Sequence, residues 1–252
     1  MMRSLLAAAL LLLPSCVELG AKVDIGYTRI DPKGSLALDS SGSGNLLSLE
    51  NDLQDDLGLT NEADSMYGHV ELDAVMFHFT ASAFRIEDKA QGTLRADFGG
   101  ITASTPVETD FDVTNYRATA GFNLLNLAGV RISPGVGVNV LDSKTTVRSL
   151  ISPLEEDLKG TVPVPFLSLD AGLEISIVDV SLGLGWINGH YGDFEGEMFD
   201  LEALARLRIL DPVHVFVGYR LVRMDVEGEQ DGDTGRFDLD WQGWTAGVGI
   251  DF

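Results

Sequence analysis

The chain has 252 residues, of which 39 are Asp or Glu and 17 are Lys or Arg, so its formal net charge is -22. This balance excludes a protein that binds nucleic acid through the phosphates, because an acidic surface repels a polyanion. Past the N-terminus, no apolar run reaches the roughly 18 residues that a spanning helix needs, which excludes a helical membrane protein. The length suits one all-β domain, and 45% of the residues are hydrophobic.

Residues 1–20 have the pattern of a secretory signal peptide, with one Arg and then an apolar run from Leu5 to Leu13. The sequence Leu13-Pro14-Ser15-Cys16 resembles a lipobox, in which the Cys is lipidated and becomes the mature N-terminus. Pro14 departs from the small residue usual there, so lipidation of Cys16 and ordinary cleavage at or before Ala21 are both open. Residues 21–252 then form the mature domain.

Ten segments of this domain alternate between apolar and polar or small residues, which is the period of a β-strand. Met198–Leu210 is the clearest case, with Phe199, Leu201 and Ala203 on one face and Asp200 and Glu202 on the other. The predicted strands are Ala21–Ile30, Met66–Ala74, Val75–Ile86, Phe111–Leu124, Val130–Val140, Val162–Ile175, Val180–Tyr191, Met198–Leu210, His214–Val226 and Phe237–Phe252.

The connections alternate between short apolar turns and long acidic stretches. Residues 31–65, 87–108 and 141–160 are predicted to be loops of the long kind. Such asymmetry is typical of barrels with short periplasmic turns and long extracellular loops. Eight or twelve strands remain alternatives, because residues 35–38 and 93–105 could extend or add strands.

The last strand carries the most informative pattern. Phe252, Ile250, Val248, Ala246 and Trp244 share one face, and small or polar residues share the other. With its terminal Phe, this strand resembles the last strand of Gram-negative outer-membrane β-barrel proteins. The resemblance implies a closed antiparallel up-and-down transmembrane barrel in the bacterial outer membrane. It also implies that Phe252 is an insertion signal, and that the partners are outer-membrane lipid and the barrel insertion machinery.

Charged residues recur on the faces predicted to point inward. The residues predicted to line the lumen are Arg117, Arg131, Asp170, Glu174, Asp200, Glu202, Arg206, Arg208 and Arg220. The mixed signs allow ion pairs, which buried charges require. Since a barrel of about eight strands is just filled by side chains, we favour a filled polar interior over a narrow water channel. Inward Gly-x-Gly pairs at 135–137, 183–185 and 247–249 would make space beside bulky neighbours.

The chemistry-bearing residues do not form a recognised catalytic set. An Asp and His site at the rim would resemble the outer-membrane proteases, and a His followed two residues later by Ser would resemble the lipid A deacylases. His69, His78, His190 and His214 fit neither pattern. Residues 231–235 begin like a calcium loop, but Gly occupies the third ligand position. We therefore expect no catalytic residue, no cofactor site and no metal site.

Aromatic residues near the strand ends suggest interfacial girdles. This group comprises Trp186, Trp241, Trp244, Tyr67, Tyr116, Tyr191 and Tyr219. The favoured hypothesis is a non-enzymatic outer-membrane barrel that serves as a structural or surface-interaction protein or as a small-solute pore. The alternatives are a barrel enzyme that acts on lipid or peptide, and a soluble acidic β-sandwich that binds a ligand.

Overall fold

The computed structural model describes residues 19–39, 50–191, 194–230 and 233–252, apart from the side chains at 39, 190–195 and 227–235. In this part of the chain no helix is long and apolar enough to span a bilayer. The strands are β1 (Leu19–Asp39), β2 (Asn51–Asp52), β3 (Ala63–Ala74), β4 (Phe77–Thr93), β5 (Pro106–Phe122), β6 (Leu125–Leu127), β7 (Val130–Ser149), β8 (Glu155–Ile175), β9 (Val178–Tyr191), β10 (Phe194–Leu210), β11 (Val213–Gln230) and β12 (Asp233–Asp251).

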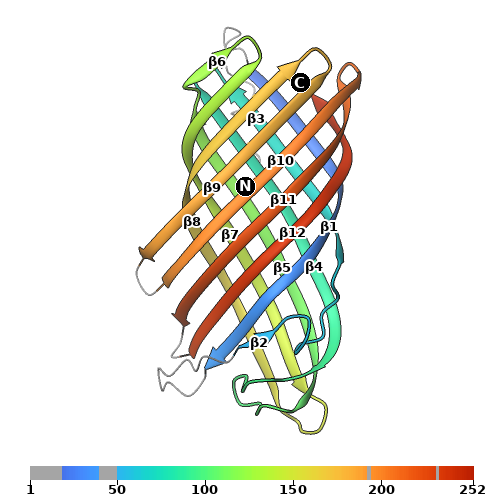
Figure 1. Cartoon of the computed structure of the whole chain (residues 1–252), viewed down its shortest axis with the longest axis vertical. Helices are drawn as coiled ribbons and strands as arrows, with labels where there is room; N and C mark the ends of the chain where they lie inside the picture. Colours follow the sequence, from blue (N-terminus) through green and yellow to red (C-terminus); the bar gives the residue numbers. More distant parts are fainter. Residues whose placement is uncertain (1–18, 40–49, 192–193, 231–232) are drawn as a thin grey trace, which may run out of the picture.

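Ten of these strands form a closed antiparallel barrel (Figure 1). Each pairs with the barrel strands before and after it, and β12 pairs with β1 from Lys22 opposite Asp251 to Asp39 opposite Thr234. The short strands β2 and β6 add to β1 and β7. Closure leaves no unpaired sheet edge, which a barrel in lipid requires. The predicted ten-stranded barrel is confirmed, and the soluble sandwich is wrong.

Short turns gather at one end of the barrel, which we call the turn end. Residues 75–76, 176–177 and 211–212 join consecutive strands there, and β1 begins and β12 ends at the same end. In membrane barrels such turns face the periplasm. Leu19 and Gly20, expected in the signal peptide, form the start of β1, whereas Cys16 lies outside the described residues.

The strands are longer than predicted, so several predicted loops are wrong. β1 continues to Asp39, β4 to Thr93 and β7 to Ser149, while β8 already begins at Glu155. Residues 35–38 belong to the extended β1 and pair with β12. These extensions project beyond the apolar outer surface of the barrel as an outer half, which ends opposite the turn end (Figure 1).

Polar and apolar residues alternate along the whole strands. In the half with the apolar outer surface, which we call the membrane half, polar residues point inward, whereas in the outer half apolar residues point inward. In the membrane half, β8 directs Leu167 and Leu169 outward and Ser168 and Asp170 inward. In the outer half, β7 buries Leu141 and Val147 inside, and Arg148 lies at the outer surface. The extensions were therefore predicted to be loops because their apolar residues occupy the face that is polar in the membrane half.

A chain segment closes the outer half from within. Residues 94–105 form a cap in which Phe98 and Ile101 are buried and pair through backbone hydrogen bonds. The Gly99 amide donates to the carbonyl of Leu38 on β1, and the Gly100 amide donates to the Glu156 carboxylate on β8. Because β1 and β8 lie five strands apart in a ring of ten, the cap crosses the mouth of the barrel.

Candidate functional site: a closed interior and an apolar outer wall

The carboxylate of Asp24 is the centre of a buried network in the membrane half. Arg206 donates to it from Nε and Nη2, at 3.0 and 2.9 Å. The His214 Nε2 atom lies 2.6 Å from Asp24 Oδ1, and the His69 Nδ1 atom lies 3.2 Å from Oδ2. All four side chains are almost fully buried. Both oxygens of the Asp24 carboxylate therefore have partners, which offsets the free-energy cost of burying its charge.

A second carboxylate, that of Glu71, connects this network to the turn end. It accepts a 2.7 Å hydrogen bond from Arg131 Nη2 and lies 3.3 Å from Arg206 Nη1. Lys22 lies 3.5 Å from the same carboxylate and also pairs with Asp179. Glu71 is thus bordered by three cationic side chains.

Three potential metal ligands converge beside this carboxylate. One ligand atom each from Glu71, Asp73 and His78 lies within 4.8 Å of the others. However, Arg131 donates to both carboxylates, at 2.7 and 2.8 Å. A guanidinium therefore supplies the positive charge that this set of donors requires, and a divalent ion would have to displace it.

A separate layer of charges lies nearer the outer half. Arg220 Nη2 is 2.7 Å from Asp200 Oδ2, and Arg117 Nε is 3.4 Å from the other oxygen of Asp200. Glu202 lies within 3.6 Å of both arginines and accepts a 2.7 Å hydrogen bond from the Tyr67 hydroxyl. Gly183 on β9 leaves room for the guanidinium of Arg117 in this layer because it carries no side chain. A Cβ there would lie 2.9 Å from Arg117 Nη2.

The structure separates the predicted lumen residues into two groups. Those at most 5% exposed inside the barrel are Arg117, Asp170, Asp200, Glu202, Arg206 and Arg220. Arg131 is partly buried toward the turn end. Arg208 and Glu174 instead lie at the rim, with their side chains 38% and 51% exposed and 3.4 Å apart. These two residues do not line a closed lumen, because the barrel wall ends there.

Two aromatic residues predicted for the girdle lie inside the barrel. Tyr67 is buried with its hydroxyl on Glu202, and Trp241 is buried against Phe84 in the outer half. Their positions follow from alternation, since Tyr67 shares its face with His69 and Glu71. Sequence reasoning also missed Asp24 as the centre of the network, although it stood among inward positions of the first strand.

Two small cavities lie among the charged side chains of the membrane half. One cavity beside Arg117, Arg131 and Glu202 and another beside Lys22 and Arg208 measure about 10 Å³ each. A cavity of this size holds about one water molecule. Farther from the turn end, the outer half is filled by apolar side chains, among them Phe84, Phe166, Met198, Trp241 and the cap residue Phe98. Charged side chains in the membrane half and apolar side chains in the outer half therefore fill the described interior.

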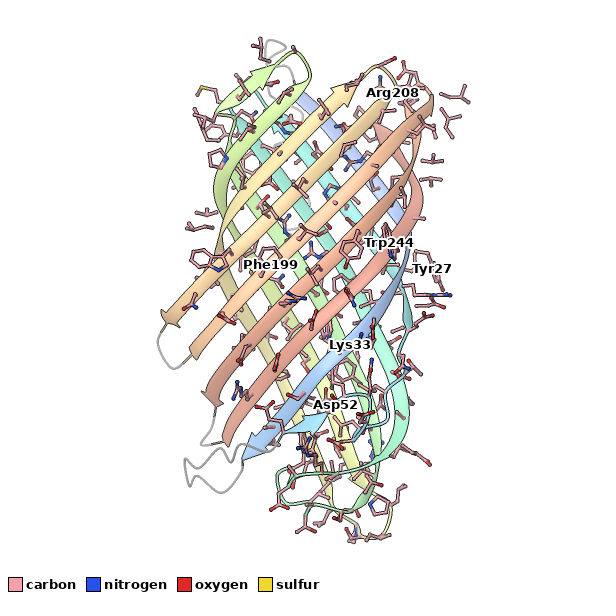
Figure 2. All side chains as sticks on the ribbon, viewed as in Figure 1. Tyr27, Lys33, Asp52, Phe199, Arg208 and Trp244 are labelled. Carbon is pink, nitrogen blue, oxygen red and sulfur yellow. The ribbon has the colours of Figure 1, made fainter. Side chains whose placement is uncertain are left out.

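The outer wall has an apolar belt bounded by aromatic residues. Figure 2 shows Tyr27, Trp244 and Phe199 at the boundary, Lys33 and Asp52 in the outer half, and Arg208 near the turn end. Tyr27 and Trp244 are 63% and 66% exposed, as side chains in contact with lipid would be. Beyond them the wall carries cross-strand ion pairs, such as Arg85 with Asp112 and Arg223 with Asp240.

Three exposed aliphatic side chains lie far from the belt. Leu150, Ile151 and Leu154 form the connection between β7 and β8 at the outer tip, and Ile151 is 74% exposed. Solvent-exposed apolar groups that cluster in this way often mark interaction sites.

Acidic residues of the outer half have pKa values that shift in opposite directions. Burial raises the pKa of Asp238, and the nearby carboxylates of Asp225 and Glu50 add to this effect. A hydrogen bond from Lys159, together with one from Thr146, lowers the pKa of Asp157. The charged form of Asp238 is therefore destabilised, and the charged form of Asp157 is stabilised.

Comparison with known proteins identifies the fold and nothing finer. No protein-family model and no curated sequence matches the chain. The outer membrane protease OmpT from Escherichia coli has a similar structure, with a TM-score of 0.55 and 12% identity over 93% of this chain and 96% of that one. The attachment invasion locus protein Ail of Yersinia pestis has a TM-score of 0.35 and 10% identity, over 93% and 99% of the two chains.

The fold and the apolar belt define the class of the molecule. It is a transmembrane β-barrel of the kind found in the bacterial outer membrane, as the pattern of the last strand predicted. The likeness to a protease does not extend to a described site. His69, His78 and His214 lie in the membrane half, and the side chain of His190 is outside the described part of the structure.

Proposed function

We propose that this protein is a non-enzymatic, non-conducting outer-membrane barrel that acts through its extracellular surface. The observation that carries the proposal is the closed interior. Charged layers with cavities of about 10 Å³ fill the membrane half, and apolar side chains and the cap fill the outer half. Of the two non-enzymatic roles expected from the sequence, this favours the structural or surface-interaction role over the small-solute pore.

The exposed tip gives this surface a specific feature. Leu150, Ile151 and Leu154 stand at the end of the barrel that projects away from the membrane. An apolar tip has no role in contact with lipid at this distance from the belt, so it supports a role in surface interaction.

Conductance in planar bilayers tests the proposal. We expect refolded protein to give no discrete channels, whereas a porin refolded in the same way gives them. Removal of cap residues 94–105 should still leave the barrel closed, because the layers around Asp24 and Asp200 remain. Discrete channels from the wild-type protein would overturn the proposal and restore the small-solute pore.

The enzyme alternative has its own test. Refolded protein should hydrolyse neither phospholipid nor lipid A nor unfolded peptide, because no described histidine lies at the outer rim. Turnover of any of these substrates that is lost on substitution of His190, the one histidine whose side chain is undescribed, would overturn the non-enzymatic assignment.

A further inference from the structure

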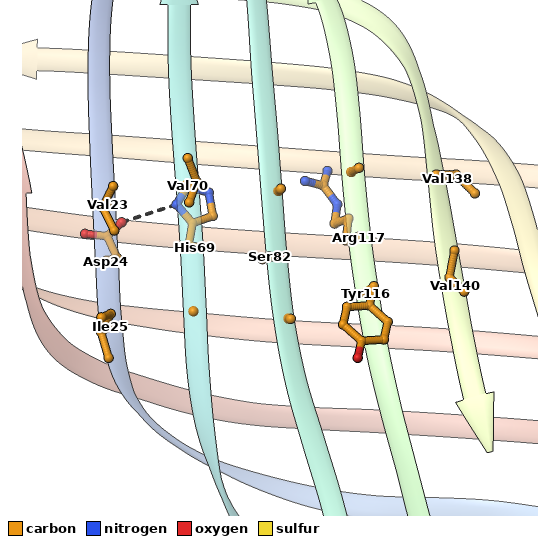
Figure 3. A pocket seen from close by; sticks show the side chains of 14 residues that line it. Val23, Asp24, Ile25, His69, Val70, Ser82, Tyr116, Arg117, Val138 and Val140 are labelled. Atoms are coloured by element: carbon orange, nitrogen blue, oxygen red, sulfur yellow. Dashed lines mark hydrogen bonds and ion pairs between the residues drawn. The ribbon is translucent and has the colours of Figure 1, made fainter. Parts of the chain in front are cut away.

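A groove crosses the lipid-facing wall of the barrel over β1, β3, β4, β5 and β7 (Figure 3). Its volume is about 500 Å³, which falls in the range of small-molecule pockets. The lining surface is almost entirely apolar. At one end the groove reaches the exposed aromatic residue Tyr116 on β5.

Small residues form the floor of this groove. Gly68, Ala81, Ala83 and Ala118 occupy neighbouring outward positions on β3, β4 and β5. A Cβ at Gly68 would have no other atom within 4 Å, so the floor is open toward the lipid. The side walls are formed by Val23, Ile25 and Val70, and by Tyr116, Val138 and Val140. In a bilayer, a hydrocarbon chain is the group that fills such a space.

Charged residues of both signs stand at the end of the groove that faces the outer half. Arg85 follows Ala83 by two positions on the same face of β4, roughly 7 Å along the strand. It donates to Asp112 from Nε and Nη2, both at 2.8 Å, and lies 2.6 Å from Glu87. Beyond Tyr27 on β1, Arg29 is paired in the same manner with Asp64 and Glu62.

The charges at this end of the groove favour a zwitterionic phospholipid headgroup over an anionic one. A guanidinium has five N–H donors, and Arg85 directs two of its nitrogens toward carboxylates, which leaves donors for a phosphate oxygen. The four carboxylates outnumber the two arginines, so a headgroup with net negative charge is repelled. A headgroup with one phosphate and one ammonium group matches both signs.

We propose that this groove binds one acyl chain of a zwitterionic phospholipid, with its phosphate at Arg85 and its ammonium group at the neighbouring carboxylates. Native mass spectrometry of the full-length barrel tests this in detergent micelles doped with phosphatidylethanolamine or phosphatidylglycerol. We expect one phosphatidylethanolamine to be retained, roughly tenfold more tightly than phosphatidylglycerol.

Two variants and a matched control separate the groove from ordinary annular lipid. Ala83→Leu fills the floor and should weaken retention roughly tenfold. Glu87→Gln combined with Asp112→Asn should remove the preference between the two headgroups, because these carboxylates hold the ammonium group and repel a net negative charge. Ala203→Leu makes the same change on the opposite wall, at an outward position of β10, and should leave retention unchanged. Heat-modifiable gel migration establishes that each variant is folded.

Three results would overturn the proposal. Equal retention by Ala83→Leu and Ala203→Leu would show annular lipid only. A preference for phosphatidylglycerol would show that the headgroup assignment is wrong. A mass of two protein chains that Ala83→Leu converts to one would show that a second copy of the barrel covers the groove.

Discussion

Asp24 illustrates how a charge is kept inside this barrel. Its carboxylate is fully buried, yet Arg206 and two histidines surround it at hydrogen-bond distances. From the sequence alone, the expected partners of Arg206 are Glu202 on the same face of its strand or an acid on a neighbouring strand. Arg206 pairs with Asp179, which lies directly opposite it on the neighbouring strand β9, and also with Asp24 on β1 and Glu71 on β3, across the interior. Alternation predicts which face a residue occupies, but partners across the lumen depend on barrel curvature and strand stagger.

Removal of Arg206 should therefore be costly. Arg206→Ala leaves Asp24 and Glu71 short of a partner in a buried position, and should lower the free energy of unfolding by about 3–5 kcal/mol. Denaturant unfolding of the refolded protein in micelles measures this. The matched control is Arg223→Ala, because Arg223 is 61% exposed and pairs with Asp240 outside the membrane. Its cost should stay below about 1 kcal/mol. Similar costs for both variants would contradict the network.

The ionised side chain of Asp238 should lower the stability of the fold, unlike an acid whose pKa is lowered by folding. Its pKa is raised by burial and by neighbouring acids, so the folded state binds its proton more tightly than the unfolded state does. Ionisation therefore lowers stability at pH values above its folded pKa.

Asp238→Asn should accordingly raise the denaturant midpoint at pH 7, and the gain should fade as the pH falls through the raised folded pKa and be absent below about 3.9, the ordinary Asp pKa. Asp157→Asn is the control of opposite sign. The pKa of Asp157 is lowered, so its contribution is present at pH 7 and is lost in acid, and its replacement should lower the midpoint at pH 7. An unchanged midpoint for Asp238→Asn would contradict the assignment.

At the scale of the strand, the existence and faces of the ten strands were predictable. Met198–Leu210 shows why, since apolar and charged residues alternate without exception between Phe199 and Glu202. The outer extensions were not predictable from the same rule. Residues 141–149 alternate equally well, but they place Leu141 and Val147 inside and Lys144 outside. The strand prediction required apolar residues on the outer face of the barrel, so it assigned residues 141–149 to a loop.

β8 should reveal the change of surroundings along one strand. Fluorophores attached to single cysteines at odd positions from 157 to 173, in a Cys16→Ser background, all lie on the outer face. A lipid-soluble quencher should act strongly at Leu167, Leu169 and Leu173 and weakly at Asp157 and Lys159. A water-soluble quencher should show the reverse, with the change near Pro165. Uniform quenching along the strand would contradict the two halves.

For the whole molecule, the sequence predicted a filled polar interior but not its limits. Arg117, Asp200, Glu202 and Arg220 were predicted to point inward, and in the structure they are buried together in one charged layer. The cap could not be predicted, because residues 94–105 have no strand period, and their burial depends on contacts with Leu38 and Glu156 on opposite walls. The groove on the outer wall likewise arises from small residues on three adjacent strands, which only the register brings together.

The inversion of the interior has a consequence for how stability depends on temperature. Unfolding of the outer half exposes buried Phe, Leu, Val and Trp side chains to water, which raises the heat capacity. The membrane half has ion pairs inside, and its apolar residues face lipid outside. Folding of this half therefore does not by itself bury apolar side chains in a protein core. The curvature of the stability of this barrel with temperature, including any weakening in the cold, therefore originates in the part that stands in water.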